Sequence, residues 1–207
     1  MYTPPAFRDD DRDSLLAMVR AARLATFVTA TDGGPMATPL PLFIDEHEGD
    51  HGVIYGHLAR ANPQWQAPTI GDALAVFMGP DAYVTPGWYA TKPETGKVVP
   101  TWNYVAVAAY GPVEFFDDAD RLHEVVRRLT ELHETGKVTP WAVHDAPPDF
   151  IVAQLRGIVG LRLPIKRIVG KRKMSQNRNA ADRAGVAAGL SASARASDRD
   201  VAPLIQV

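Results

Sequence analysis

The sequence predicts a mainly β protein, an antiparallel barrel with helices between some of its strands. Six or seven short strand-like runs are separated by tight turn signals. These strands do not alternate regularly with helices, as the strands of a parallel sheet would. The chain has 207 residues, 46% of them hydrophobic, which is enough for one domain with a real core. We predict that domain over residues 1–190 and a flexible tail over residues 191–207, where small and polar residues show no periodicity.

One helix and two strands are predicted near the start of the chain. Residues 9–23 should be helical, because apolar side chains share one face and aspartates occupy the first turn. Leu24–Ala30 is typical of a strand and is followed by the turn signal DGG. Met36–Asp45 forms a second strand-like run. It should be irregular or at a sheet edge, because Pro39 and Pro41 have no N–H to donate to a ladder.

The rest of the chain continues the strand pattern and adds three helices. The clearest helix is predicted over Asp117–Thr135 and should end at Gly136. Shorter helices are predicted over Pro148–Leu155, which has proline near its start, and over Asn179–Leu190. The apolar stripe of the clearest helix consists of Leu122, Val125, Val126, Leu129 and Leu132. Further strands are predicted over Val53–His57, Ala73–Met78, Ala82–Thr85, Thr101–Phe116 and Ile158–Ile168.

The composition excludes several classes of function. With 22 basic and 24 acidic residues, the formal charge of −2 argues against a dedicated nucleic-acid binder. The chain contains no cysteine, so disulfides, thiolate nucleophiles and cysteine metal sites are absent. Neither a signal peptide nor an apolar run of roughly 20 residues is present, which predicts a soluble, cytoplasmic protein without a membrane span. The six histidines lack metal-binding spacing, and no phosphate-loop, dinucleotide or GxSxG motif occurs, so no metal site is expected.

The first segment suited to ligand binding is HLARANPQW, residues 57–65. Arg60 and Asn62 stand where a strand gives way to a turn or short helix. Free backbone N–H groups and a guanidinium at such a place suit a phosphate group. A capped surface turn with a solvated arginine is the alternative interpretation.

The second segment is a pair of aromatic clusters, YVTPGWY at residues 83–89 and VPTWNY at residues 99–104. Aromatic side chains beside strands can line a slot for a flat conjugated ligand. The side chains that could stack on such a ring are Trp88, Tyr89, Trp102 and Tyr104. Core packing and a dimer interface are the alternatives, because both often use tryptophan and tyrosine.

The third segment is GKRKMSQNR, residues 170–178. It combines four basic residues with Ser175, Gln176 and Asn177. Gln and Asn side chains present both donors and acceptors, as the polar edge of a flavin-type ring requires. A solvated basic turn is one alternative. A contact with nucleic-acid phosphates is another.

Taken in order, these segments resemble the PaiB family of flavin-binding proteins. The resemblance extends over about residues 2–190 and includes MYTPPAF, TPLPLFID, GIVGL and DRAGVAAGL. It implies an antiparallel split β-barrel of the FMN-binding type with flanking α-helices, usually a homodimer with flavin at the subunit interface. The name-giving member of the family is described as a negative regulator of transcription in sporulating bacteria.

The resemblance also implies how FMN would be held. Side chains at the end of HLARAN would hold the phosphate, and the irregular strand over residues 38–42 would offer backbone groups to the polar edge of the isoalloxazine ring. Aromatic residues of VPTWNY would close the pocket, in one arrangement from the second subunit, and SQNR would add polar contacts. The implied residues are Arg60, Asn62, Thr38, Pro39, Leu40, Trp102, Tyr104, Ser175, Gln176 and Arg178. One departure is Ala108, where the family pattern has a histidine.

Three functions fit these observations. The first is an FMN-binding regulator of transcription, or a redox or ligand sensor. The second is an FMN-dependent oxidoreductase acting on a small molecule, in which the cofactor would carry the chemistry and few catalytic side chains need be visible. The third is a DNA-binding repressor, which the net charge and the lack of a helix-turn-helix pattern disfavour. Basic residues at 166–173 keep it open, and the sequence assigns no catalytic residue.

Overall fold

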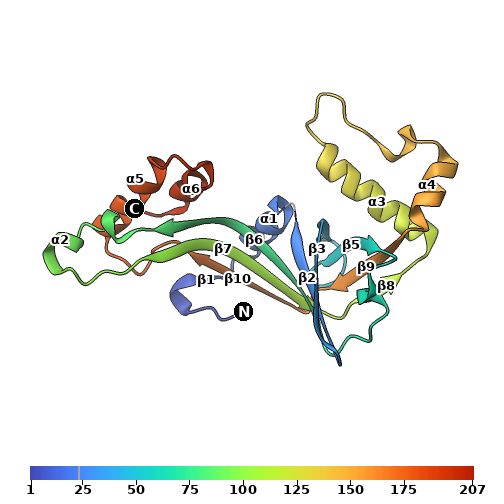
Figure 1. Cartoon of the computed structure of the whole chain (residues 1–207), viewed down its shortest axis with the longest axis horizontal. Helices are drawn as coiled ribbons and strands as arrows, with labels where there is room; N and C mark the ends of the chain where they lie inside the picture. The colour runs from blue at the N-terminus through green and yellow to red at the C-terminus, as the bar shows by residue number, and fades with distance from the viewer. Residues whose placement is uncertain (23) are drawn as a thin grey trace. The chain divides into compact units, whose positions relative to one another are not determined.

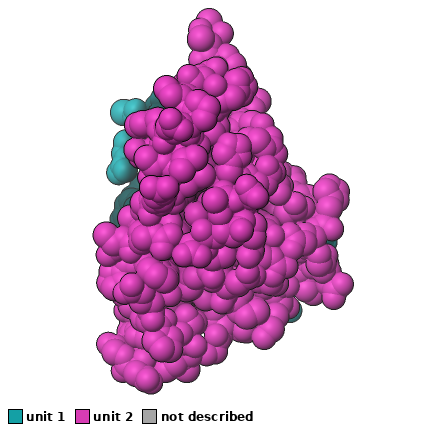
Figure 2. Space-filling view, turned by 90° about the vertical axis from the view of Figure 1, so that its right-hand side faces the viewer, with its two compact units in different colours: residues 1–18, 78–107, 169–207 teal, residues 19–77, 108–168 magenta. Residues whose placement is uncertain are grey.

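The structure, a computed structural model, describes residues 1–22 and 24–207. It is built from antiparallel sheets with helices placed around them (Figure 1). The chain forms two compact units, shown in teal and magenta in Figure 2. Unit 1 comprises residues 1–18, 78–107 and 169–207, and unit 2 comprises residues 19–77 and 108–168. The strands β6, β7 and β10 have residues in both units.

In unit 1 the strands follow the order β1-β10-β7-β6, and Arg8 of β1 pairs with Lys171 of β10. The core of this unit lies between these strands and the C-terminal helices, and it includes Tyr89, Val105, Met174 and Val186. The strand bounds are β1 Arg8–Asp9, β6 Ala73–Val84, β7 Thr101–Gly111 and β10 Arg167–Lys173. The helices are η1 Pro5–Phe7, α1 Arg12–Ala21, η3 Pro86–Trp88, α2 Lys92–Thr95, α5 Ala180–Ser191, α6 Ala196–Val201 and η5 Ala202–Leu204, of which α1 continues into unit 2.

In unit 2 the hairpin of β2 and β3 pairs Ala25 with Leu40, and β6 lies on the other side of β2. A second sheet has the order β4-β5-β9-β8 and is covered by α3 and α4 through a core that includes Phe43 and Phe116. The strand bounds are β2 Ala25–Thr31, β3 Gly34–Leu40, β4 Leu42–Asp45, β5 Val53–Ala59, β8 Glu114–Phe116 and β9 Ile158–Pro164. The helices are η2 Pro63–Trp65, α3 Ala119–Glu134, η4 Val143–Asp145 and α4 Pro148–Leu155.

The best-predicted elements have strong local signals at their ends. Asp118 caps α3 by accepting a hydrogen bond from the Arg121 N–H, and Gly136 follows the helix with a φ of 86°. The helix α4 begins at Pro148, as predicted. The stripe on α3 is narrower than expected, because Leu132 is 42% exposed. The predicted helix at residues 9–23 is observed over Arg12–Ala21, and residue 23 lies outside the described residues.

The irregular strand expected over residues 36–45 is observed as two strands. β3 and β4 are separated at Pro41, and each is the last strand of its sheet. Because proline has no N–H to donate, this break and these edge positions follow from the sequence. The predicted edge position is therefore confirmed.

The strand β6 is longer than predicted. We expected separate strands over Ala73–Met78 and Ala82–Thr85, but β6 continues through Gly79 and Pro80. Pairing with β2 ends at Phe77, so the missing N–H of Pro80 removes no bond from that ladder. A Cβ on Gly79 would lie 2.7 Å from the Met18 side chain, so glycine here makes room for a packed methionine.

Two predicted long strands are each divided in the structure. The run over Thr101–Phe116 becomes β7 and β8, separated by Pro112, and the run over Ile158–Ile168 becomes β9 and β10. At the second break, the N–H of Ile165 donates to Gly52 O and the N–H of Lys166 donates to Tyr110 O. Apolar residues occur at both breaks, Val113 at the first and Ile165 at the second, so hydrophobicity alone did not reveal them.

The segment after Leu190 contains regular structure that we did not predict. Residues 191–207 include α6 (Figure 1) and η5. Val201, Ala202 and Ile205 are buried in the core of unit 1. These apolar side chains are too few and too irregularly spaced to form a periodic pattern, yet they pack against α5. Among the described residues, no helix is both long and apolar enough to cross a membrane.

Candidate functional site

The ten residues predicted to hold FMN divide evenly between the two units, so each group is described within its own unit. Unit 2 contains Thr38, Pro39, Leu40, Arg60 and Asn62. Unit 1 contains Trp102, Tyr104, Ser175, Gln176 and Arg178.

Arg60 follows β5 in unit 2, and its guanidinium already has several protein partners. Nε donates to Arg156 O at 2.8 Å, and Nη2 donates to Ile158 O at 3.2 Å. Nη1 lies 3.4 Å from a carboxylate oxygen of Asp117. The guanidinium also lies 5.8 Å from the centre of the Trp65 ring. A phosphate bound by Arg60 would therefore compete with groups that join the end of β5 to the start of β9.

Asn62 belongs to a hydrogen-bonded network inside unit 2. Its Oδ1 accepts from the Gln64 N–H at 2.9 Å, which caps η2, and its Nδ2 donates to Thr38 Oγ1 at 2.9 Å. Thr38 Oγ1 donates to Gln64 Oε1 at 2.6 Å. The Gln64 Nε2 donates to Thr29 Oγ1 at 3.1 Å and to Met36 O at 3.2 Å, and Gln64 is completely buried. Both predicted residues, Asn62 and Thr38, thus hold together η2, β2 and β3.

Sequence reasoning missed Gln64, which is at the centre of this network. The available signal was the pair Asn62-Pro63, because asparagine followed by proline is typical of a helix N-cap and first position. The two remaining predictions in unit 2 lie on β3, a terminal strand of its sheet, with Leu40 buried and Pro39 exposed.

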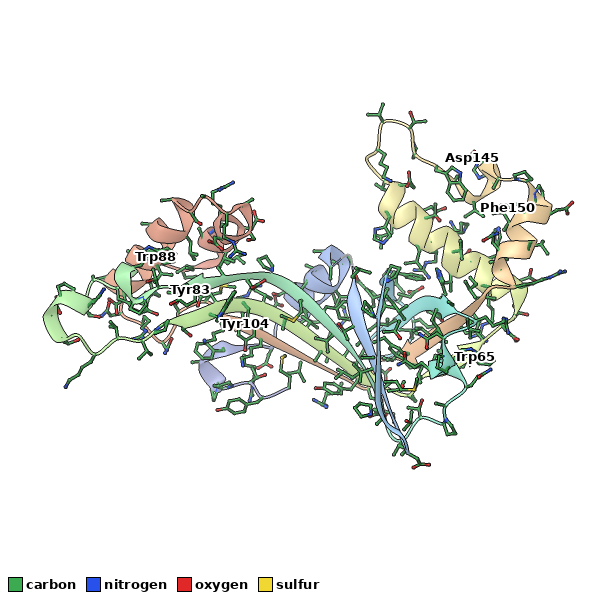
Figure 3. All side chains as sticks on the ribbon, in the orientation of Figure 1. Trp65, Tyr83, Trp88, Tyr104, Asp145 and Phe150 are labelled. Carbon is green, nitrogen blue, oxygen red and sulfur yellow. The ribbon has the colours of Figure 1, made fainter. Side chains whose placement is uncertain are left out.

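One face of β7 in unit 1 carries exposed aromatic side chains. Trp102 is 48% exposed and Tyr83 of β6 is 46% exposed, and their rings meet edge to face at 6.1 Å. The Lys171 ammonium lies 5.2 Å from the centre of the Tyr104 ring and 5.7 Å from that of Tyr2. We call Tyr2, Tyr83, Trp102, Tyr104 and Lys171 the aromatic face. Figure 3 labels Tyr83 and Tyr104 on their neighbouring strands.

The opposite face of β7 carries Asn103, which is completely buried. Its Nδ2 donates to Ser175 Oγ at 3.1 Å, and Ser175 Oγ donates back to Asn103 Oδ1 at the same distance. Ser175 has a φ of 62°, a left-handed backbone conformation that is unusual for residues other than glycine. Gln176 holds the same turn, because it accepts from the Met174 N–H at 2.7 Å and donates to Arg172 O at 2.6 Å.

A small pocket of about 90 Å³ opens beside this turn. Arg178 lies across it, with its guanidinium 4.5 Å from the centre of the Tyr89 ring. We call this the SQNR pocket, and the residues that line it are Tyr89, Val99, Pro100, Thr101, Asn103, Lys173, Ser175, Asn177 and Arg178.

Successive side chains of a strand point to opposite faces of its sheet. Trp102 and Tyr104 therefore lie on the aromatic face, while Thr101 and Asn103 line the SQNR pocket. The structure brings Ser175 and Arg178 together but places them across β7 from Trp102 and Tyr104. The predicted residues of unit 1 form two surfaces within this unit.

Trp88 and Tyr89 have a packing role that the sequence left open. A Cβ added to Gly189 would lie 2.3 Å from the Trp88 ring, and one on Gly185 would lie 2.0 Å from the Trp88 carbonyl oxygen. These two glycines of α5 therefore allow the segment at Trp88 to approach closely. Tyr89 is 2% exposed in the same core. We expected both rings to be able to stack on a ligand, but they pack inside unit 1.

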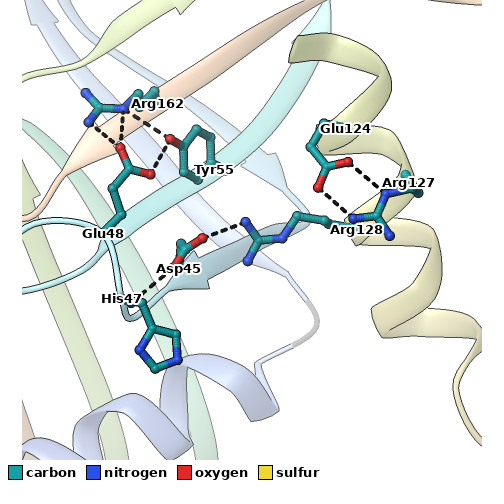
Figure 4. A network of polar contacts seen from close by, with 8 residues as sticks. All are labelled: Asp45, His47, Glu48, Tyr55, Glu124, Arg127, Arg128 and Arg162. Carbon is teal, nitrogen blue, oxygen red and sulfur yellow. Dashed lines mark hydrogen bonds and ion pairs between the residues drawn. The ribbon is translucent and has the colours of Figure 1, made fainter. Parts of the chain in front are cut away.

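Unit 2 contains a second group of charged side chains that sequence reasoning did not find (Figure 4). Glu48 accepts a hydrogen bond from the Tyr55 hydroxyl at 2.6 Å and forms an ion pair with Arg162. The Tyr55 hydrogen bond, aided by Arg162, lowers the pKa of Glu48, while burial raises the pKa of Tyr55. Arg128 donates to Asp45 at 2.7 Å and lowers the pKa of that carboxyl.

An open pocket of about 320 Å³ lies beside this network in unit 2. The Phe43 and Tyr55 rings stack at 5.5 Å in its wall, and Arg128 lies 4.4 Å from the centre of the Phe43 ring. Across the described part of the chain, no group of three or more histidine, aspartate or glutamate side chains could hold a metal ion. Burial lowers the pKa of His57, and its Nδ1 has no hydrogen-bond partner among the described residues.

The antiparallel sheets and flanking helices define the class of fold, the split barrel, which solved structures share. Solved structures with this arrangement include the flavocytochrome Anf3 from Azotobacter vinelandii, with a TM-score of 0.60 and 19% identity over 86% of this chain and 75% of that one. Another is the FAD and heme binding protein from Mycobacterium smegmatis, with a TM-score of 0.59 and 17% identity over 86% of this chain and 78% of that one. At these identities the likeness shows the fold alone, and it confirms the predicted fold class.

The sequence comparisons show the family. A family model described as "Putative FMN-binding domain" matches residues 1–167. The "Protease synthase and sporulation protein PAI 2" of Bacillus subtilis (strain 168) is 35% identical over 183 residues, which cover 88% of this chain and 85% of that protein. The chain therefore belongs to the PaiB family and contains its FMN-binding domain. The residues of SQNR lie beyond the part that the family model matches.

Proposed function

We propose that this protein is an FMN-dependent regulator of transcription, or a redox or ligand sensor, that works as a homodimer with flavin at the subunit interface. The observation that carries the proposal is the aromatic face. Large aromatic side chains usually lose most of their exposed surface on folding, and those that stay exposed together often form a binding surface. Here Tyr83 and Trp102 stay about half exposed on neighbouring strands.

The residues of this chain fit the two chemical parts of FMN. The aromatic face offers flat rings for the isoalloxazine, and the Lys171 ammonium adds positive charge beside them. Considered separately within unit 2, the terminal strand β3 would, by the family resemblance, offer backbone groups of Thr38, Pro39 and Leu40 to the polar edge of a flavin ring. When bound, FMN supplies redox chemistry, and the chain binds and orients the cofactor.

Two sites on this chain are candidates for binding the phosphate of FMN. Arg60 and Asn62 match the family motif, but their polar atoms already have partners within unit 2. In unit 1, SQNR presents Arg178 and Ser175 beside a small pocket. The family resemblance supports the first site. The Arg178 guanidinium, which forms no ion pair within the described residues, supports the second site.

The departure at Ala108 bears on function. This residue is 2% exposed on β7 in unit 2, so its methyl group packs in the core where the family pattern has a histidine. An alanine side chain cannot donate or accept a proton, so this chain lacks any function that a histidine would have at this position. This favours a binding or sensing role over an oxidoreductase that uses that group for proton transfer.

Direct DNA binding has less support from the charges. Within unit 2 Lys166 pairs with Asp72 at 3.2 Å, and within unit 1 Arg172 pairs with Asp9 at 3.5 Å. Two cations of the basic run at residues 166–173 are thus partly neutralised. A repressor that binds DNA directly should retard its target promoter with steep salt dependence. An oxidoreductase should instead consume NADH or NADPH when FMN is present.

The decisive variant for the proposed function is Trp102→Ala. Its matched control is Trp141→Ala, because Trp141 lies in unit 2 with a similar exposure of 45%. We expect Trp102→Ala to lower the amount of FMN retained after desalting or to shift the protein from dimer to monomer in light scattering, and Trp141→Ala to change neither. If the two variants behave alike, the aromatic face is not the flavin surface.

A further inference from the structure

Tyr89 lines the SQNR pocket, and its buried hydroxyl has hydrogen-bonding capacity that the described residues leave unused. Tyr89 is 2% exposed, and its hydroxyl has no hydrogen-bond partner among the residues that the structure describes. Most buried side-chain polar atoms in folded proteins have a hydrogen-bond partner, so a buried hydroxyl without one is unusual. A ligand that accepts a hydrogen bond from Tyr89 would supply one.

The same pocket holds two positive charges without carboxylate partners. The Lys173 ammonium donates to Thr101 Oγ1 and, at 2.8 Å, to Trp102 O, which are both uncharged acceptors. The Arg178 guanidinium lies over the Tyr89 ring and forms no ion pair within the described residues. Asp182, a buried carboxylate of unit 1, accepts hydrogen bonds from Thr91 instead. The pocket is therefore positively charged and suits a negatively charged ligand.

The wall of the pocket is fixed before any ligand arrives. Ser175 is 3% exposed, has the left-handed φ of 62°, and is held by the reciprocal pair of hydrogen bonds with Asn103. Backbone conformations of this kind cost free energy and cluster at ligand-binding sites. The Gln176 side chain ties the turn to the backbone that precedes it, by accepting from the Met174 N–H and donating to Arg172 O. Such a site loses little conformational freedom on binding.

The size of the pocket limits what it can take. Its volume of about 90 Å³ is well below the roughly 300–1,000 Å³ typical of pockets that enclose drug-sized ligands. It therefore suits a small charged group and not a tricyclic ring. The charge-assisted donors of Lys173 and Arg178, the Tyr89 hydroxyl and the Asn177 amide together suit an anion with several acceptor oxygens.

We propose that the SQNR pocket binds a phosphate group, with Lys173 and Arg178 supplying the charge and Tyr89 a hydrogen bond. The group has two possible sources, the phosphate of FMN or that of a separate phosphorylated molecule. The first source rests on the proposed function, and the second does not. A separate molecule is compatible with the position of the pocket, because Thr101 and Asn103 in its wall lie across β7 from Trp102 and Tyr104.

The test is calorimetric titration of the full chain with inorganic phosphate. Tyr89→Phe removes only the hydroxyl and should weaken phosphate binding by about 3- to 10-fold, the loss of one hydrogen bond. Because that hydroxyl has no partner in the free protein, the melting temperature of this variant should be no lower than that of the wild type. A wild type that does not bind phosphate, or a Tyr89→Phe variant with unchanged affinity, overturns the proposal.

A charge variant and its control make the test independent of the hydroxyl. Arg178→Gln should weaken phosphate binding by about 10- to 100-fold, because it removes a charge-assisted donor. Arg195→Gln removes an exposed charge from the same unit, outside the pocket, and should change the affinity less than about twofold. Equal effects of the two variants would show that net charge, and not the pocket, attracts phosphate.

Titrations with FMN and riboflavin identify the source of the phosphate group. If it belongs to FMN, inorganic phosphate competes with FMN but not with riboflavin, and Arg178→Gln weakens FMN alone. If it belongs to another molecule, saturating phosphate leaves the FMN affinity unchanged. A protein that binds phosphate at the pocket but neither flavin would contradict the proposed function and leave the phosphate site standing.

Discussion

The two units differ in how much hydrogen-bonding capacity their motifs leave for a ligand. In unit 2 the side chains of Arg60 and Asn62 are bonded to other protein groups. In unit 1 the Tyr89 hydroxyl has no partner among the described residues. The Arg178 guanidinium lies over the Tyr89 ring and forms no ion pair with those residues. A motif tells which hydrogen-bonding groups are present, whereas the fold decides how many of them remain for a ligand.

The largest effect should come from the centre of the unit 2 network. Gln64→Leu would leave the hydroxyls of Thr29 and Thr38 without their amide partner, so we expect the free energy of unfolding to fall by about 2–4 kcal/mol. Urea denaturation measures this change. Gln66→Leu is the control, because Gln66 is exposed two residues further on. Equal losses in the two variants would show that the network does not stabilise unit 2.

Arg60→Gln tests whether this arginine is structural. It removes the guanidinium hydrogen bonds to Arg156 O and Ile158 O, and we expect a loss of about 1–2 kcal/mol in the free energy of unfolding. Arg127→Gln should cost less, because Arg127 pairs only with glutamates of its own helix among the described residues.

The same Arg60 variant also tests whether the arginine of unit 2 is available to bind a ligand. The family motif predicts that losing this arginine weakens FMN binding by about 1–3 kcal/mol. If Arg60→Gln lowers the FMN affinity by that much while the free energy of unfolding stays unchanged, Arg60 binds phosphate, and unit 2 has ligand-binding capacity after all.

A pair of substitutions at Ser175 measures the backbone strain in unit 1. Ser175→Ala removes the hydrogen bonds to buried Asn103 and keeps a side chain at a φ of 62°. Ser175→Gly removes the same hydrogen bonds but tolerates this conformation. We expect the glycine variant to be more stable than the alanine variant by about 1 kcal/mol in thermal unfolding. Equal stability would mean that the turn relaxes and is not strained.

The smallest effect should come from the partly exposed ion pairs of Figure 4. Hydrogen bonding to Tyr55 and Arg162 lowers the pKa of Glu48 below its usual 4.5, so its contribution is present above pH 4.5 and is lost as the pH falls through the lowered value. Glu48→Gln should flatten this acid-side dependence. Because Glu48 is 38% exposed, the loss at neutral pH should stay under about 1 kcal/mol. Glu94→Gln, at an exposed position in unit 1, is the control for the loss of one carboxylate.

Elements with local end signals were predictable from the sequence, whereas elements that depend on distant packing were not. The helix α3 could be predicted because Asp118 and Gly136 mark its ends. The continuity of β6 through Pro80 depends on where its pairing with β2 ends. The regular structure of residues 196–205 depends on the burial of Val201. No local pattern contains either fact.

For the site, the sequence predicted residue types better than their grouping. It marked VPTWNY and SQNR as parts of one flavin site to which the second subunit could contribute, and within one chain Trp102 and Ser175 lie on opposite sides of β7. The two-residue period of a strand could have separated Trp102 from Asn103 in advance. That the Tyr89 hydroxyl would be buried without a partner follows only from the packed structure.

The visible absorption spectrum of the purified full chain, recorded before and after FMN is added and the sample is desalted, tests the central claim most directly. If the chain is a flavoprotein of the PaiB family, the flavin bands remain with the protein after desalting. A folded protein that is colourless after FMN has been added and the sample has been desalted would contradict the proposed FMN-dependent function.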